Sequence, residues 1–265
     1  LCIVMDTIAL VIKQVHKMMQ YKHKVGLGVI SVCAVAIFAA GCQKKSDEEQ
    51  SHVGKNAVTL IQAKVVEVKH PSKTFCDEDE CTEYSLKTVQ TNLPWINEYF
   101  LKRIEKDVPD AFTPSKEKDP AKVANQPTGE SQISVRYLGQ NDQFASFEMQ
   151  TSLYGAGAAH GMSHNEYVIF DLSQKKRLAL ADILKPNIEK KLLEKLYEAN
   201  QTWLEAHKIE PAKLELSDNY YYGVNGIVFV YPLYELASYA EGMSELTLPY
   251  YDAAAFIKPE YLINQ

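Results

Sequence analysis

The stretch Ser131–Tyr154, SQISVRYLGQNDQFASFEMQTSLY, decides what kind of fold this chain adopts. Ile133, Val135 and Tyr137 alternate with polar residues, which is the two-residue period of a half-buried strand. The turn-forming letters GQND follow, and Phe144–Tyr154 supplies a second strand rich in apolar residues. The stretch therefore predicts two antiparallel strands joined by a turn, with one face toward a core.

The chain before this hairpin predicts two more strands and a helix. Val58–Val68 and Glu83–Gln90 are rich in β-forming residues and predict strands. Over Leu93–Ile104 the apolar residues recur at helical spacing, which predicts a helix with one buried face. Pro109–Gly129 contains four prolines and many charges, so we expect a loop there.

The chain after the hairpin begins with Gly155–Gly161, which is too rich in Gly and Ala to be a core element. Strands are predicted at Tyr167–Leu172, Asn225–Tyr231 and Leu246–Leu248. A longer helix is predicted from Pro186 to His207, because its apolar residues form one stripe.

Strands that cluster around two main helices, without strict alternation of the two, predict an α+β fold with mainly antiparallel sheets. We expect two adjacent lobes. The first covers residues 57–154, and the second covers residues 155–265.

A signal for export lies near the N-terminus, where residues 38–42 read FAAGC. The basic stretch Gln20–Lys24 precedes the apolar run Val25–Ala39, whose length is typical of secretion rather than of a membrane span. The residues before Cys42 resemble the lipobox of bacterial lipoproteins, whose cysteine thiol carries the lipid. We expect a signal peptide at residues 19–41 and palmitate-bearing acylation of the cysteine. The alternative is a buried apolar helix with an incidental cysteine.

We interpret residues 1–18 as an overextended N-terminus, with Met18 or Met19 as the true start. Gln43 stands where an Asp would resemble the inner-membrane retention signal of enteric bacteria, which favours the outer membrane, facing the periplasm. The polar, charged segment after the cysteine has no apolar period, so residues 42–56 predict a flexible lipidated tether.

The charge of the exported chain is acidic. The full sequence has 28 basic and 34 acidic side chains, and removal of residues 1–41 takes away four lysines and one aspartate, which leaves a formal charge of -9. Nucleic acid is not expected as a partner, because phosphate binding needs a basic stripe. An acidic field accelerates association with cationic partners instead.

The cysteines become an orderly set after export. Cys2 and Cys33 leave with the signal, Cys42 is acylated, and Cys76 and Cys81 remain. An even pair in an exported chain predicts a disulfide. A zinc site would need a second pair, and a redox motif would have two residues between the cysteines rather than four.

Two segments of the second half resemble a known family. Gly157–Gly161, GAAHG, and Tyr234–Gly242, YELASYAEG, look like the RsiV-like domain, in which a Gly-Gly-Ala-His-Gly loop and a Tyr-Glu-Ile-Ala-Pro-Tyr-Ala-x-Gly segment recur in this order. Here Ala158 replaces the second Gly and Ser238 replaces the Pro. Residues 57–154 are similar to the domain that commonly precedes it, which also precedes the catalytic domain of some peptidoglycan deacetylases.

The named member of that family is the extracellular part of an anti-sigma factor that binds lysozyme. The resemblance therefore implies a lysozyme-like muramidase or a peptidoglycan fragment as the ligand. No lysozyme-contacting residue can be matched from a motif, and none is assigned.

The candidate binding residues are His160, Tyr234, Glu235 and Tyr239, which lie in the two segments that carry the resemblance. Tyrosines combine a large rigid face with a hydroxyl, so they anchor interfaces and stack on sugars, although some must line the core. Glu235 could act as an acid or base if its pKa were raised, or it could cap backbone N–H groups. We expect His160 to fix its loop by hydrogen bonding, with Gly157 permitting a tight backbone path.

Metal binding has a weaker basis. His160 and His164 are four residues apart with Glu166 nearby, but the glycines make a helix improbable and the order is not His-Glu-x-x-His. We expect no metal and no cofactor. The acidic loop Asp77–Glu80, closed by the predicted disulfide, is either a contact for a basic protein or a solvated hairpin tip.

These observations predict a non-catalytic lipoprotein of the bacterial cell envelope, anchored to the bilayer through acylated Cys42, whose soluble part binds a ligand. One rival hypothesis is an enzyme acting on cell-wall glycan, with His160 and Glu235 as its polar pair. Another is a structural lipoprotein that aids envelope assembly.

Overall fold

The computed structural model describes residues 58–78, 80–114 and 126–263. All of them belong to one of two units of the chain, Gly54–Gln265. The predicted N-terminal extension, signal peptide and tether, residues 1–56, lie outside the described residues.

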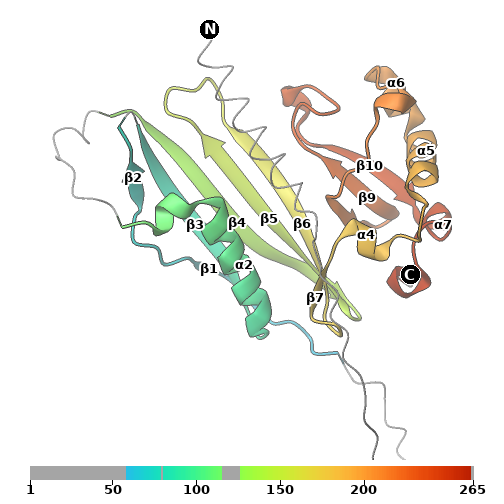
Figure 1. The fold of residues 1–265 in the computed structure, drawn as a ribbon, viewed down its shortest axis with the longest axis horizontal. Helices are drawn as coiled ribbons and strands as arrows, with labels where there is room; N and C mark the ends of the chain where they lie inside the picture. Colours follow the sequence, from blue (N-terminus) through green and yellow to red (C-terminus); the bar gives the residue numbers. More distant parts are fainter. Residues whose placement is uncertain (1–57, 79, 115–125, 264–265) are drawn as a thin grey trace, which may run out of the picture. The chain divides into compact units, whose positions relative to one another are not determined.

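The strands predicted around Ser131–Tyr154 belong to a seven-stranded sheet (Figure 1). Its strands lie in the order β1, β3, β4, β5, β6, β7, and β2 pairs with the same edge of β3 as β1 does. Neighbours are antiparallel except β3 and β4, which are parallel. The strands are β1 (Ala63–Glu67), β2 (Thr74–Cys76), β3 (Cys81–Thr91), β4 (Thr128–Asn141), β5 (Phe144–Tyr154), β6 (Met162–Asp171) and β7 (Lys176–Leu178).

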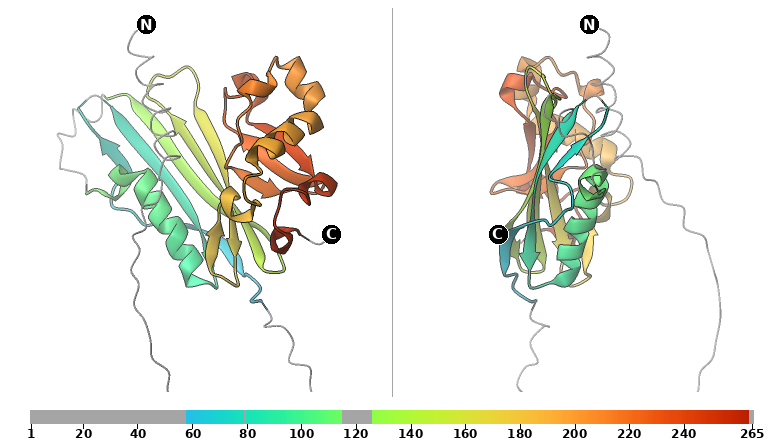
Figure 2. Two further views of the ribbon diagram at one scale, coloured as in Figure 1. Left: turned by 45° about the vertical axis from the view of Figure 1, so that its right-hand side comes forward. Right: turned by 90° about the vertical axis from the view of Figure 1, so that its left-hand side faces the viewer.

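The connection from β3 to β4 explains the parallel pair, because parallel neighbours need a crossover. Its described part holds α2 (Pro94–Asp107) and the 3-10 helix η1 (Pro109–Phe112). Helix α2 buries Ile96, Phe100 and Ile104 against one face of the sheet, as the helical spacing predicts. Figure 2 shows the helix on one side of the strands.

The C-terminal part contains a three-stranded antiparallel sheet in the order β10, β9, β8, with helix α5 against β10. The strands are β8 (Tyr220–Tyr222), β9 (Gly226–Tyr231) and β10 (Ser244–Pro249). The α-helices are α4 (Leu180–Ile183), α5 (Glu189–Ala199), α6 (Gln201–Ala206) and α7 (Tyr250–Ala253), and the 3-10 helices are η2 (Pro211–Lys213), η3 (Tyr239–Glu241) and η4 (Pro259–Tyr261). The fold is α+β with mostly antiparallel sheets, which confirms the predicted class.

The buried apolar residues form two hydrophobic cores. One lies between α2 and the large sheet and includes Leu86 and Phe147, and the other includes Leu196 and Phe229 of the C-terminal part. Strands β5 and β6 pair along their length across the predicted lobe boundary at residues 154 and 155. The two cores therefore share one sheet.

The helix predicted over Pro186–His207 is two helices, and the prediction of one continuous helix is wrong. Asn200 ends α5. Its Nδ2 donates to the carbonyls of Leu196, at 2.7 Å, and Thr247, at 3.0 Å, and its Oδ1 accepts from the Thr247 N–H at 3.1 Å. The side chain pairs with the backbone of β10 instead of pointing to solvent, and this competes with continuing the helix.

The turn predicted at Gly139–Asp142 is shorter in the structure and lies further along the chain. Asn141 pairs with Phe144, so only residues 142 and 143 form the loop. Asp142 adopts a positive φ of 50°, which Asp tolerates better than most residues.

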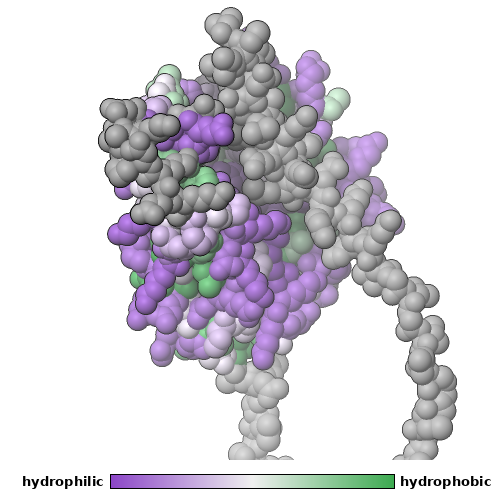
Figure 3. Space-filling model, turned by 60° about the vertical axis from the view of Figure 1, so that its left-hand side comes forward, coloured by the Kyte–Doolittle hydropathy of each residue, from purple (hydrophilic) through white to green (hydrophobic). Residues whose placement is uncertain are grey.

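Hydrophilic residues make up most of the described surface in Figure 3, and hydrophobic ones form small separate patches. Among the described residues, no helix combines the length and apolar composition that a membrane crossing requires.

Candidate functional site

The Gly- and Ala-rich segment after β5 is a loop that joins β5 to β6. Gly157 has a φ of 73°, a left-handed conformation that glycine adopts without strain, and the Tyr154 hydroxyl donates to the Ala158 carbonyl at 2.6 Å. A Cβ on Gly161 would lie 3.1 Å from the Leu153 carbonyl oxygen. The two glycines therefore allow the tight path predicted for this loop.

The segment Tyr234–Gly242 lies beside that loop. Leu236 is 7% exposed and inserts into the C-terminal core. Tyr234 has a φ of 68°, which costs a non-glycine residue about 1–2 kcal/mol. Such backbone strain in a packed structure is a pointer to function.

Three rings from the two segments meet, and we call His160, Tyr234 and Tyr239 the aromatic cluster. The ring centroids of His160 and Tyr239 are 4.3 Å apart, and those of Tyr234 and Tyr239 are 5.6 Å apart. The Tyr239 hydroxyl donates to the Gly161 carbonyl at 2.9 Å. The tyrosines keep 54% and 37% of their surfaces exposed, in chain order. The structure thus brings together three of the four predicted binding residues.

His160 carries a proton on Nδ1 in this arrangement. Nδ1 lies 3.1 Å from the carbonyl oxygen of Gly161, which can only accept a hydrogen bond. Nε2 lies 3.3 Å from the Tyr234 hydroxyl, which can donate to it. His160 therefore fixes its own loop, as predicted, and also links that loop to the other segment.

Glu235 is not part of the aromatic cluster. Burial of its carboxyl group and then the charge of Glu215 raise its pKa, although the residue as a whole is exposed. No hydrogen bond or ion pair joins it to His160 among the described residues. The acid–base pair of the enzyme hypothesis therefore gains no support from the geometry.

The residues considered for a metal site, His160, His164 and Glu166, lie in different environments. His164 lies on β6, and its burial lowers its pKa. Glu166 pairs with Arg103, at 2.8 Å, and with Arg177, at 3.1 Å. Within the described ranges, no group of three or more His, Cys, Asp or Glu side chains could hold a metal ion.

The segment Tyr234–Gly242 is held on its other side by an ion pair that the sequence does not predict. His207 Nε2 lies 2.6 Å from the Glu241 carboxylate, and His207 Nδ1 lies 2.8 Å from the Trp203 carbonyl. The Trp203 carbonyl and then the Glu241 carboxylate raise the pKa of His207. No local signal marks this pair, because its members are 34 residues apart.

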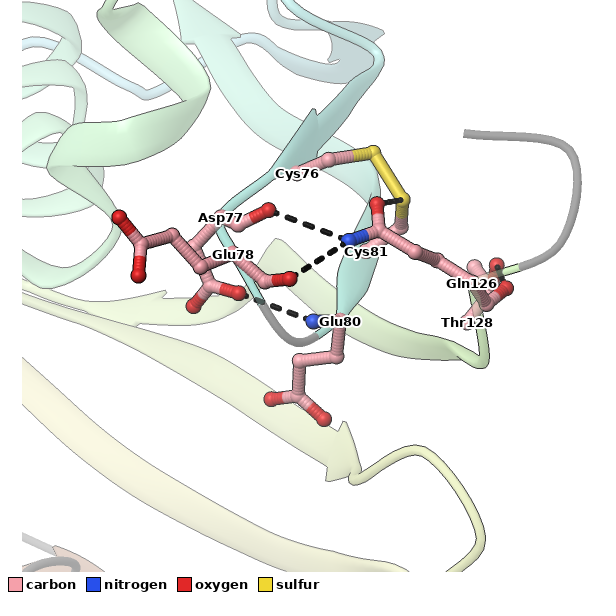
Figure 4. The surroundings of a disulfide bond; sticks show 7 residues. All are labelled: Cys76, Asp77, Glu78, Glu80, Cys81, Gln126 and Thr128. Atoms are coloured by element: carbon pink, nitrogen blue, oxygen red, sulfur yellow. Dashed lines mark hydrogen bonds between the residues drawn. A yellow bond between two sulfur atoms is a disulfide. The ribbon is translucent and has the colours of Figure 1, made fainter. Parts of the chain in front are cut away.

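The disulfide Cys76–Cys81 is present and closes the hairpin between β2 and β3 (Figure 4). The Gln126 amide donates to the carbonyls of Asp77, at 3.3 Å, and Glu78, at 3.0 Å, so the tip is held from its backbone. Three acidic residues of the loop are exposed, and we call them the acidic tip: Asp77, Glu78 and Glu80.

The acidic tip and the aromatic cluster lie at the same end of the large sheet. Cys81 at the tip pairs with Thr128, and Glu130, two residues further along β4, pairs with Tyr154 at the start of the cluster's loop. Figure 1 shows the β2–β3 turn and the β5–β6 loop at one end of the strands. This end offers ring faces, hydroxyl groups and negative charge to a ligand.

The fold is one that two solved DUF3298 family structures share. The crystal structure of a DUF3298 family protein from Pseudomonas aeruginosa PAO1 is 19% identical, with a TM-score of 0.57, and covers 79% of this chain and 100% of that one. A DUF3298 family member from Bacteroides fragilis NCTC 9343 is 15% identical, with a TM-score of 0.58, and covers 79% of this chain and 98% of that one.

The sequence itself contains a DUF3298 domain. Residues 171–251 match the family described as "Protein of unknown function (DUF3298)". The match includes the segment Tyr234–Gly242 but begins after the loop that carries His160. None of the curated proteins matches the chain. The resemblance to the RsiV-like domain, and that of residues 57–154 to the domain preceding it, stay predictions.

Proposed function

We propose that this protein is a lipid-anchored, non-catalytic binding protein of the bacterial envelope whose ligand is a lysozyme-like muramidase. The observation that carries the proposal is the aromatic cluster, whose two tyrosines are exposed although they are fixed by ring contacts and hydrogen bonds. Rigid, exposed aromatic side chains supply contact area at little entropic cost, which is typical of interface anchors.

The charge at this end supports a basic partner. The acidic tip carries three exposed carboxylates on a disulfide-closed hairpin, next to the strand ends that lead to Tyr154. Complementary charge raises the rate of encounter and fixes orientation, while buried aromatic anchors supply most of the affinity. Lysozymes of the hen type are strongly basic, so they fit this surface.

The test is a calorimetric titration of the soluble chain from Gln43, with its disulfide intact, into hen lysozyme while muramidase activity is followed. We expect saturable binding that survives moderate salt and that lowers the muramidase activity. Heat that vanishes with salt would show only non-specific charge attraction and would contradict the proposal.

The double substitution Tyr234→Ala and Tyr239→Ala should weaken binding by about 100-fold, the loss expected for two interface anchors. The matched control is Tyr251→Ala, because Tyr251 is 82% exposed and lies on α7, outside the cluster. Equal affinity of both variants would refute the site. Cleavage of peptidoglycan by the chain alone would refute the non-catalytic assignment and favour the enzyme hypothesis.

A further inference from the structure

The face of the large sheet opposite α2 carries short polar side chains in register. Successive side chains of a strand point to opposite faces of the sheet. Ile133 and Val135 point into the core under α2, so the residues that alternate with them on β4, and their partners on β5 and β6, point away from α2. The pairing of β4, β5 and β6 sets two rows of three residues across the strands. We call these six residues the hydroxyl-amide face: Gln132, Ser152 and Ser163 in one row, and Ser134, Gln150 and Asn165 in the next.

Larger side chains bound this face along the strands. Tyr154, 42% exposed, stands at one end beside its partner Glu130, whose carboxylate accepts a hydrogen bond from Gln132 Nε2 at 3.2 Å. At the other end a row in register holds Arg136, Glu148 and Tyr167, in which the exposed Arg136 pairs with the buried carboxylate of Glu148. Tyr154 lies six positions along β5 from Glu148, so the boundaries are about 20 Å apart at about 3.4 Å per residue. The face is long enough for an oligomer rather than a single sugar.

Tyr167 also closes the side of the face next to the C-terminal part. Its ring lies 4.4 Å, centroid to centroid, from that of Tyr221, whose hydroxyl donates to Glu245 at 3.2 Å. Burial and then Glu245 raise the pKa of Tyr221 to about 12, so this hydroxyl stays protonated and able to donate.

The composition of the face is not what strand stability alone would select. Thr, aromatic and β-branched residues stabilise strands, whereas Asn is depleted there and Ser offers little to pack. None of the six residues is charged, although a solvated sheet face usually gains solubility from charges. Three of them, Gln132, Gln150 and Ser163, are exposed, and their hydroxyl and carboxamide groups can both donate and accept hydrogen bonds.

We propose that the hydroxyl-amide face binds a neutral glycan strand that lies along β5. A hydroxyl-rich, uncharged ligand matches a set of groups that donate and accept equally, and it would stack on Tyr154 and receive hydrogen bonds from Arg136 at the far end. The six residues contain no Lys or Arg for phosphate and no apolar side chain for a hydrophobic partner. The inference rests on the proposed envelope function, but it uses a surface other than the aromatic cluster.

The experiment measures binding of the soluble chain from Gln43 to chitohexaose by calorimetry and to protein-free peptidoglycan sacculi by co-sedimentation. The test variant is Gln132→Ala with Gln150→Ala, and the matched control is Gln201→Ala, an exposed glutamine on α6. We expect the double variant to bind at least about tenfold more weakly, since it loses one or two hydrogen bonds per side chain, and the control to bind like the wild type. If the double variant melts early, Ser163→Lys at the exposed end of its row replaces it.

No saturable binding of the wild type to either glycan would overturn the proposal. Binding that the face variants leave intact but that Tyr234→Ala with Tyr239→Ala abolishes would place the glycan at the aromatic cluster and would also overturn it. Retention only on sacculi that still carry their proteins would identify a protein ligand instead. Each result is independent of the lysozyme titration, so failure of one proposal leaves the other standing.

Discussion

Replacement of Leu236 by alanine tests whether one buried side chain anchors the segment that carries Tyr234 and Tyr239. Leu236 is 7% exposed and is buried in the C-terminal core, while both tyrosines are exposed. Leu→Ala in a core costs about 2–5 kcal/mol from lost transfer energy and the cavity. Leu236 lies near the surface, where neighbours can relax, so we expect the free energy of unfolding to fall by about 2–3 kcal/mol. For a domain of this size that corresponds to a melting temperature lower by about 5–10 °C.

The assay is urea unfolding followed by far-ultraviolet circular dichroism, with the disulfide intact and the slope compared between variants. Leu233→Ala is the matched control, because Leu233 lies in the same turn, is half-buried and is absent from both cores. We expect the control to lose less than about 1 kcal/mol. Equal losses for the two variants would refute the anchoring role of Leu236, and so would a loss below about 1 kcal/mol for Leu236→Ala.

Three further changes test other parts of the structure. Asn200→Ala removes three hydrogen bonds and leaves two backbone groups of β10 without that partner, so we expect a loss of about 2–3 kcal/mol in urea unfolding; less than about 0.5 kcal/mol would contradict this. Cys76→Ser with Cys81→Ser opens a short loop and should cost about 2 kcal/mol by the same assay, and no change would show that the disulfide is dispensable. The pKa of His207 is raised above 6.5, and the pKa of Glu241 is lowered below 4.5. The stabilisation from this pair is therefore complete between pH 4.5 and 6.5. It is lost as the pH rises through the raised pKa of His207 or falls through the lowered pKa of Glu241. The melting temperature of the wild type minus that of Glu241→Gln should therefore be largest near pH 5–6 and shrink above pH 7, and a constant difference would count against the pair.

The sequence predicts those helices and strands that bury one face, because burial of one face requires apolar residues in a characteristic pattern. Phe144–Tyr154, predicted as a strand from its richness in apolar residues, has the bounds of β5, and α2 follows from the helical spacing of its three buried residues. The sequence does not predict the break at Asn200, because the partner of Asn200 is Thr247, 47 residues further along the chain. Strand β8 has three residues, all tyrosines, and a pattern that short has no readable period.

The candidate site also has features that the sequence predicts and features that only the fold reveals. The resemblance marks both segments of the aromatic cluster, but the contact of His160 with Tyr234 spans 74 residues and is visible only in the fold. Glu235 lies in the same segment as Tyr234 and Tyr239, but its carboxylate is close to Glu215 rather than to the cluster. The backbone turns at Tyr234, where φ is positive. The parallel pairing of β3 with β4, which places the acidic tip at the same end of the sheet as this site, depends on a crossover that no local pattern encodes.

The position of β1 has a mechanical consequence. The described chain begins at Val58 and enters β1 at Ala63, which pairs with Thr91 at the end of β3 away from the disulfide hairpin (Figure 1). A partner held at the aromatic cluster and a membrane tether at the N-terminus would pull on opposite ends of the sheet, along the strands. Hydrogen bonds between antiparallel strands are perpendicular to that direction, so the load would fall on the whole β1–β3 ladder in shear rather than opening it one bond at a time. If the proposed tether and partner were both engaged, the ladder between β1 and β3 would carry the load in this resistant geometry.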